Sequence, residues 1–275
     1  MSGRLTDVCT PDVENGRVAC EKTMSSLQDS GAPPSVPAQQ EYWDRRWEQQ
    51  QKPNRWQQQR AEVVLAIARD LPLDKPRILD LGCGTGFTTK MLSQLGTAEG
   101  IDLSPIAVAI ARAEYPDVRF RSGDLFEIDL SETPLDLIVC QEVIPHVHDQ
   151  YGMLRKISAA LKPGGYLIAT AANKFVMKRL GDNDGGLIGS GPADPDEHIK
   201  NWLSRRELKS LMSEHFTILK STTIIPVGSR GLLRVINSYK LNNVLERMTS
   251  RQGVENLKGQ LGFGYTIIVV GQKLH

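Results

Sequence analysis

Three glycines at alternate positions follow a short apolar run. Arg77–Leu81 predicts a buried strand, and Gly82, Gly84 and Gly86 come directly after it. Glycine lets a backbone turn sharply and approach a ligand without a Cβ atom in the way. A helix expected over residues 85–95 would begin there, and its unpaired N–H groups would favour negative ligand atoms. The turn predicts a ligand site, with a plain structural turn as the alternative. Its spacing is not the G-x-G-x-x-G of dinucleotide-binding proteins.

Acidic residues end the next two predicted strands. Thr97–Ile101 leads to Asp102, about 20 residues beyond the glycine turn, where an acid can accept both hydroxyls of a ribose. Val118–Arg121 leads to Asp124, which could accept hydrogen bonds from an exocyclic amine. With the glycine turn, these acids indicate a cofactor that carries a ribose and an amine.

These residues lie in a repeated alternation of strand and helix patterns. Strands separated by helix-length segments indicate βαβ units and a mainly parallel sheet. We therefore expect an α/β, doubly wound, mostly parallel seven-stranded sheet with helices on both faces. The expected strands cover residues 77–81, 97–101, 118–121, 135–140, 166–172, 217–225 and 265–270.

Two segments interrupt the alternation. Residues 174–200 are rich in Gly and Pro, and residues 227–262 carry a helix-like stretch at 232–248. Both follow late strands, and in doubly wound folds ligands bind beyond the carboxyl ends of strands. We predict that both are cap insertions that wall a substrate pocket. Between them, Ser204 is expected to cap a helix over residues 204–213.

Taken together, the motifs resemble those of class I S-adenosylmethionine-dependent methyltransferases. The motifs are Asp80-Leu-Gly-Cys-Gly-Thr-Gly86, Asp102, Gly123-Asp124, Gln141-Glu142-Val143 and Leu161-Lys-Pro-Gly-Gly165. The pattern is most similar to that of ubiquinone-biosynthesis-type and related small-molecule methyltransferases, and it covers roughly residues 41–225 and the last strand. The resemblance implies a Rossmann-like methyltransferase fold and S-adenosylmethionine as the cofactor.

Roles in cofactor binding follow from that resemblance. Asp80 and Gly82 would face the methionine amino end, and Gln141 would touch the methionine portion. Asp102 would hold the ribose, while Asp124 and the backbone of Leu125 would bind adenine. An aromatic helix with Tyr42, Trp43 and Trp47 would close over the cofactor, or it is simply packing. The implied cofactor-binding residues are Asp80, Gly82, Gly84, Gly86, Asp102, Leu103, Asp124, Leu125, Gln141, Tyr42 and Trp47.

Histidines near the predicted methyl donor are candidates for catalysis. A hydroxyl acceptor must lose its proton, and an imidazole, with an ordinary pKa near 6.5, suits that task. His146 follows the fourth strand, and His198 lies in the first insertion. We expect one of them to be the general base, with structural hydrogen bonding as the alternative, and Glu142 is the third candidate catalytic residue. Some similar proteins read Glu-x-x-Glu-His here and use a divalent metal, but Pro145 replaces the second Glu, so we predict no metal site. The alternative is an incomplete ligand set of Glu142, His146 and His198.

The charge is unevenly distributed along a nearly neutral chain. The whole chain has 33 Lys and Arg against 32 Asp and Glu, yet residues 199–275 carry 12 basic and 4 acidic residues. This basic part would favour an anionic acceptor, and we predict O-methylation of a small molecule. The alternatives are an RNA or protein methyltransferase that uses the basic C-terminal third, and a non-catalytic cofactor-binding interaction protein. Nucleic acid is not expected, because no RNA-binding module and no Asn-Pro-Pro-Tyr motif is present.

Composition indicates the compartment and the domain limits. No apolar stretch approaches the roughly 20 residues of a membrane span, and residues 1–40 hold no secretory signal. Four cysteines are too few for a disulfide scaffold, so we predict a cytoplasmic protein without membrane contact. Residues 1–38 lack hydrophobic periodicity and are predicted to be a flexible tail. Residues 39–275 would form the methyltransferase domain; the sequence carries no signal of oligomeric state.

Overall fold

A computed structural model describes residues 8–11, 18–21, 34–130, 134–178, 199, 201–226 and 231–274. The chain divides into two compact units, residues 1–34 and 35–275. The first unit holds a two-stranded antiparallel sheet, β1 (Val8–Pro11) and β2 (Val18–Glu21). The predicted tail over residues 1–38 falls mostly outside the described residues. The second unit begins with Ser35, which caps the first helix, α1 (Val36–Gln49), inside the predicted tail.

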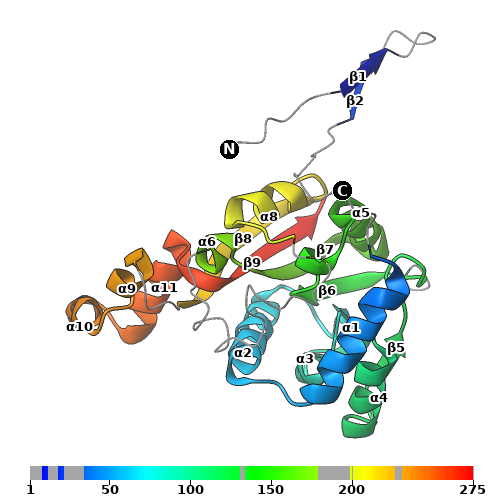
Figure 1. The fold of residues 1–275 in the computed structure, drawn as a ribbon, viewed down its shortest axis with the longest axis horizontal. Helices are drawn as coiled ribbons and strands as arrows, with labels where there is room; N and C mark the ends of the chain where they lie inside the picture. Colours follow the sequence, from blue (N-terminus) through cyan, green and yellow to red (C-terminus); the bar gives the residue numbers. More distant parts are fainter. Residues whose placement is uncertain are drawn as a thin grey trace. The chain divides into compact units, whose positions relative to one another are not determined.

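A seven-stranded sheet forms the centre of the second unit (Figure 1). Its order is β5-β4-β3-β6-β7-β9-β8, and the strands from β5 to β7 are parallel while β9 runs antiparallel to both neighbours. The predicted fold class is therefore confirmed. The strands are β3 (Arg77–Leu81), β4 (Thr97–Asp102), β5 (Arg119–Ser122), β6 (Leu135–Gln141), β7 (Leu161–Ala172), β8 (Phe216–Pro226) and β9 (Gly264–Lys273).

The strand order places the topological switch point of the sheet between β3 and β6. From β3 the chain moves outward to β4 and β5, and it then returns to pair β6 with the other side of β3. At such a switch point the loops beyond the strand ends diverge and leave a crevice at the carboxyl edge. The glycine turn after β3 and the Gln141-Glu142 pair at the end of β6 therefore lie at this same edge.

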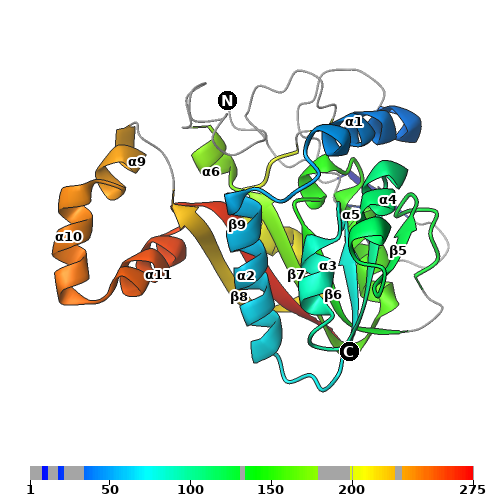
Figure 2. The same cartoon turned by 90° about the horizontal axis from the view of Figure 1, so that it is seen from below.

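Helices cover both faces of the sheet (Figure 2). The helices after α1 are α2 (Arg55–Asp70), α3 (Phe87–Leu92), α4 (Pro105–Glu114), α5 (Gln150–Ala160), α6 (Lys174–Met177), α8 (Arg205–Met212), α9 (Gly231–Ile236), α10 (Tyr239–Met248) and α11 (Arg251–Leu261). Of these, α9 and α10 project away from the sheet instead of covering a face (Figures 1 and 2). A short 3₁₀ helix, η1 (Ile144–His146), follows β6. No helix in the described part of the chain is long and apolar enough to cross a membrane.

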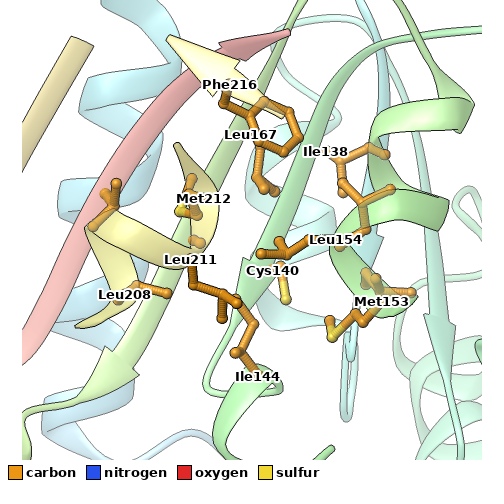
Figure 3. Packing of buried hydrophobic residues seen from close by; sticks show 14 of the residues in the cluster. Ile138, Cys140, Ile144, Met153, Leu154, Leu167, Leu208, Leu211, Met212 and Phe216 are labelled. Carbon is orange, nitrogen blue, oxygen red and sulfur yellow. The ribbon is translucent and has the colours of Figure 1, made fainter. Parts of the chain in front are cut away.

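The core is divided by the alternation of side chains along the strands. Ile138 and Cys140 of β6 face a cluster with α5 and α8, to which Met153 and Leu211 contribute (Figure 3). Leu137, like Val139 of the same strand, faces the opposite cluster with α2. Because successive residues of a strand point to opposite faces, a strand apolar at both sets of positions is buried on both sides. This double burial fixes the sheet that positions the site.

Several element limits differ from the sequence prediction. The helix expected over residues 85–95 is shorter, 87–92, because Gly86 adopts a left-handed conformation at its start. The strand expected at 166–172 begins at Leu161, which already pairs with Leu135. The helix-like stretch at 232–248 is broken into α9 and α10, and α11 follows them. Ser204 caps α8 as predicted, in a capping box with Glu207.

Candidate active site at the carboxyl edge of the sheet

The glycine turn after β3 has no space for side chains. Gly82, Gly84 and Gly86 all have positive φ angles, of 76°, 53° and 84°. A Cβ atom on Gly82 would lie 2.1 Å from the Val143 side chain, and one on Gly84 would lie 2.7 Å from the Trp47 ring. Both the conformation and the close neighbours therefore require glycine.

Asp80, just before the turn, is a buried acid with one oxygen unused. Its side chain is 1% exposed, and Oδ2 accepts a hydrogen bond from Thr89 Oγ1 at 2.7 Å. Oδ1 is buried with no hydrogen-bond partner among the described residues. Burial raises the pKa of Asp80 from 3.8 to about 7, against the opposing effect of the Thr89 hydrogen bond. A buried acceptor without a donor is costly, so this oxygen suits a cationic or hydrogen-bonding ligand group.

Asp102, at the end of β4, organises the glycine turn. Its carboxylate accepts hydrogen bonds from the backbone N–H of Gly84 at 2.8 Å and of Ser104 at 2.9 Å. Burial raises its pKa, and the same two N–H groups oppose that effect. The half-buried Leu103 follows it. The carboxylate therefore links the first glycine turn to the next strand end, a contact that the sequence did not predict.

Asp124 and Leu125 follow β5, farther along the same edge. Both are half-buried, and Asp124 Oδ1 accepts a hydrogen bond from the backbone N–H of Phe126 at 2.9 Å. Leu125 packs against the main core cluster. The sequence-predicted residues after β3, β4, β5 and β6 are thus brought to one edge of the sheet.

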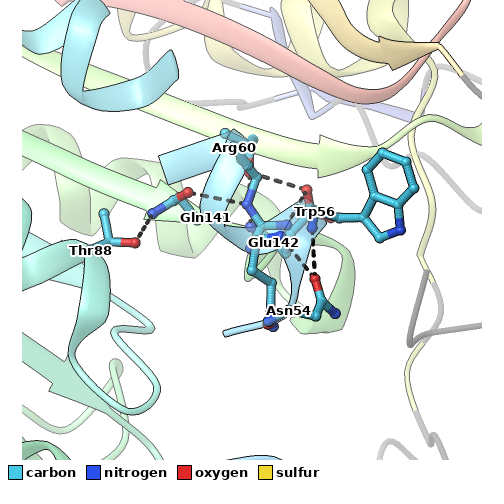
Figure 4. A network of polar contacts seen from close by, with 8 residues as sticks. Asn54, Trp56, Arg60, Thr88, Gln141 and Glu142 are labelled. Atoms are coloured by element: carbon cyan, nitrogen blue, oxygen red, sulfur yellow. Dashed lines mark hydrogen bonds and ion pairs between the residues drawn. The ribbon is translucent and has the colours of Figure 1, made fainter. Parts of the chain in front are cut away.

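The residues after β6 are held by an arginine that the sequence reasoning missed (Figure 4). Arg60 of α2 donates from Nε to Gln141 Oε1 at 3.1 Å, and its Nη1 lies 3.4 Å from Glu142 Oε1. Gln141 Nε2 donates in turn to Thr88 Oγ1 at 3.0 Å. Thr170 Oγ1 donates to Glu142 Oε1 at 3.2 Å. This network connects α2, β6, β7 and the start of α3.

Glu142 has a strained backbone at the centre of this network. Its φ angle is 58°, in the left-handed region that non-glycine residues rarely adopt. Such strain is kept only where the surroundings hold it, and it gathers at functional sites. The contacts to Arg60 and Thr170 hold the Glu142 carboxylate in place, so it links the end of β6 to α2 and β7.

Helix α1 lies over the glycine turn. Tyr42 is buried, and the Trp47 ring lies close to Gly84. Trp43 packs edge-to-face against His146, with ring centroids 5.0 Å apart. The hydroxyl of Ser104 donates to Asp44 of α1. The aromatic residues thus contact both the turn and a candidate base, as a covering helix requires.

The candidate bases are placed differently. His146 lies at the end of η1, and its Nδ1 is 3.2 Å from the Ile199 carbonyl oxygen. His148, two residues later, is exposed. His198, the other predicted base, lies outside the described residues. Cys83, in the turn, is buried, and burial raises the pKa of its thiol, so the neutral form is kept.

The site fits a cofactor with cationic groups and a ribose. Asp80, two residues before the glycine turn, has an unused buried oxygen, and Asp102 at the end of β4 accepts the N–H of Gly84 in that turn. Within the described ranges, no group of three or more His, Cys, Asp or Glu side chains could hold a metal ion. The fold, and the residues at the carboxyl edge of its sheet, are those of the class I S-adenosylmethionine-dependent methyltransferases, whose cofactor is S-adenosylmethionine.

Comparison with protein families identifies the group more closely. Residues 43–216 match the model of a family described as methyltransferase domain. The match covers more than half of the chain, and the chain belongs to this family. The predicted family, fold and cofactor are therefore confirmed.

Individual relatives cover shorter stretches. A ubiquinone biosynthesis O-methyltransferase of Methylobacterium nodulans is 32% identical over 142 residues, which are 50% of this chain and 53% of the relative. A probable S-adenosylmethionine-dependent methyltransferase of Mycolicibacterium smegmatis is 31% identical over 101 residues, 36% of this chain and 39% of the relative. The chain thus spans about half, or less, of the length of these curated relatives.

Solved structures agree with the fold. The S-adenosylmethionine-dependent methyltransferase of Mesorhizobium loti has a TM-score of 0.54 at 20% identity, over 78% of this chain and 98% of that one. At this level of identity the likeness supports the architecture alone, because one fold hosts many activities.

Proposed function

We propose that this protein transfers a methyl group from S-adenosylmethionine to a hydroxyl group of a small-molecule acceptor. The observation that carries the proposal is the position of His146, beside the strand end where Gln141 and Glu142 meet the glycine turn. The O-methyltransferase names of the 28–32% identical relatives support the same reaction.

The glycine turn and the strand-end acids would hold the cofactor. Asp80 offers its unused oxygen to the methionine amino group, and Asp102 lies where a ribose is expected. Asp124 and Leu125 would take the adenine, and Gln141 would adjoin the methionine portion. When bound, S-adenosylmethionine supplies a methyl group on a sulfonium, which reacts by in-line displacement. The main task of the protein is alignment, which can contribute about 7–11 kcal/mol to lowering a barrier.

His146 would accept the proton from the acceptor hydroxyl. The Ile199 carbonyl can only accept a hydrogen bond, so a proton placed on Nδ1 would be donated to it. In that tautomer Nε2 carries the lone pair, as a general base requires. Trp43 packs against the ring and helps to fix its plane. Glu142 would serve as a positioning residue rather than as a base, because Arg60 and Thr170 already engage its carboxylate.

Paired histidine variants test this role. His146→Gln should lower kcat by about 10²- to 10⁴-fold, the usual contribution of a general base, with little change in cofactor affinity. His148→Gln is the matched control, because that side chain is exposed two residues away, and it should keep wild-type turnover. Turnover would be followed with labelled S-adenosylmethionine and a panel of neutral and anionic hydroxyl compounds. Wild-type kcat in His146→Gln would remove His146 from the mechanism.

A further inference from the structure

Helix α10 presents a row of apolar side chains to solvent. Leu241, Val244 and Met248 are three and seven positions apart, a spacing that places them on one face of the helix. Val244 is 55% exposed and Met248 is 81% exposed. In both views α9 and α10 lie at the end of the unit farthest from the parallel strands (Figures 1 and 2). Exposed apolar side chains gathered in a row, rather than scattered singly, indicate an interaction surface.

Basic residues flank the same side of that row. Lys240 comes one position before Leu241, and Arg247 comes one position before Met248, so both lie on one border of the apolar face. Both are exposed, and neither forms an ion pair with any residue that the structure describes. The acidic residue of α10, Glu246, falls on the opposite side of the helix. The helix therefore has an apolar row with a cationic border.

The two neighbouring helices also expose apolar side chains, and α11 connects this part of the chain to the sheet. Val235 of α9 and Leu261 of α11 are each 60% exposed. α11 is fixed to the sheet through the buried Val254 and through Thr223 Oγ1, which donates to the Gly259 carbonyl at 3.0 Å. Lys258 of α11 also donates to the Asn237 side chain, at 3.3 Å, between α9 and α10. Helix α10 itself has no buried residue, and it is connected to the sheet through these contacts of α11 and Asn237.

We propose that α9 and α10 dock on the surface of an anionic lipid bilayer. An amphipathic helix with aliphatic residues on one face and Lys or Arg beside them lies in the plane of such an interface. Its apolar row enters the headgroup boundary, while its cations remain with the anionic headgroups. Such a surface contact differs from the membrane span that the sequence excludes, and it would revise the prediction of no membrane contact.

Charge and apolarity decide against two other partners. Residues 231–261 carry five basic and two acidic residues, so a second copy on this face would bring like charges together. A nucleic acid would pair with the cations, but it would leave the aliphatic row without an apolar partner. An anionic bilayer satisfies both features at once.

Vesicle flotation of the full chain tests the proposal. The protein should float with vesicles that contain phosphatidylglycerol, and it should remain below with vesicles of phosphatidylcholine alone. Val244→Asp and Met248→Asp should each weaken partitioning by about tenfold or more, because each removes a buried apolar side chain from the interface. Lys240→Gln combined with Arg247→Gln should weaken it by about 25-fold, roughly fivefold for each cation.

Controls separate docking from misfolding and from other partners. Leu219→Asp alters an exposed aliphatic residue of β8 outside the helices, and it should float like the wild type. All variants should keep the wild-type Tm, since the altered side chains are exposed. The proposal is overturned if anionic vesicles fail to capture the wild type, or if the α10 variants float as well as the control. It is also overturned if sedimentation shows a dimer that Met248→Asp dissociates, or if RNA binds this face instead.

Discussion

Replacing Asp80 with asparagine should stabilise the free protein at alkaline pH. The acid is 1% exposed, and burial raises its pKa from 3.8 to about 7. Below pH of about 4 the carboxyl is protonated in both the folded and the unfolded protein, and its contribution to stability is fully present. As the pH rises through 7 the unfolded chain holds an ionised, hydrated carboxylate, whereas the folded chain must ionise a buried one. Stability is therefore lost over this interval.

The expected size follows from the two pKa values. A pKa change from 3.8 to about 7 corresponds to about 4 kcal/mol of unfolding free energy at pH 8. Asparagine has nearly the same shape, and its amide oxygen can still accept the hydrogen bond from Thr89. Asp80→Asn should therefore recover most of that free energy at pH 8 and little at pH of about 4. Burial raises the pKa of Asp102 as well. The stability of Asp80→Asn should therefore still depend on pH, but less steeply than that of the wild type.

Urea unfolding of the free protein at several pH values measures this effect. Asp136→Asn is the matched control on the neighbouring strand. Burial opposes the ionisation of Asp136, but hydrogen bonds from Lys162 and from the Arg77 N–H outweigh it and lower its pKa. Above pH of about 4, that variant should lose a constant amount of unfolding free energy. The slope of its unfolding free energy against pH should therefore equal that of the wild type. If Asp80→Asn also keeps the wild-type slope of unfolding free energy against pH, the unpartnered Asp80 oxygen is hydrated and does not await a ligand group.

Three further perturbations probe the same edge of the sheet. Asp102→Ala should weaken S-adenosylmethionine binding by about 1.5–3 kcal/mol for each charged hydrogen bond lost, and an unchanged calorimetric affinity would contradict the ribose assignment. Arg60→Met should lower the free energy of unfolding in urea by about 1.5–3 kcal/mol, because Glu142 then keeps a strained backbone without its cation; an unchanged urea midpoint would show that the network is not needed. Deleting residues 1–34 should leave Tm nearly unchanged, whereas deleting residues 1–49 should lower both Tm and cofactor affinity by removing the helix over the glycine turn. Equal effects of the two deletions would contradict the covering role of α1.

Local patterns in the sequence were enough to predict the sheet and its strand-end residues. A strand buried on both faces is an apolar run, and a positive φ angle at a crowded turn demands glycine, so Gly82 and Asp102 stand out by type and spacing. The same reasoning located His146 after the fourth strand. These features depend on neighbours within a few residues along the chain.

Features that depend on distant partners could not be predicted. Arg60 lies in the polar, glutamine-rich first half of α2, and its partners Gln141 and Glu142 are about 80 residues away. The positive φ angle of Glu142 has no glycine or asparagine to signal it. The link from Asp102 to the Gly84 N–H arises only when two strand ends are brought together.

The identity of the atom that receives the methyl group can be measured directly. The wild-type protein would be incubated with S-adenosylmethionine carrying a labelled methyl group and, in parallel, with small hydroxyl compounds, small amines, RNA and protein. We expect the label on the oxygen of a small hydroxyl acceptor, with an equal amount of S-adenosylhomocysteine. His146→Gln should reduce this product, and His148→Gln should not. Label on nitrogen, RNA or protein, with none on any small hydroxyl acceptor, would contradict this expectation.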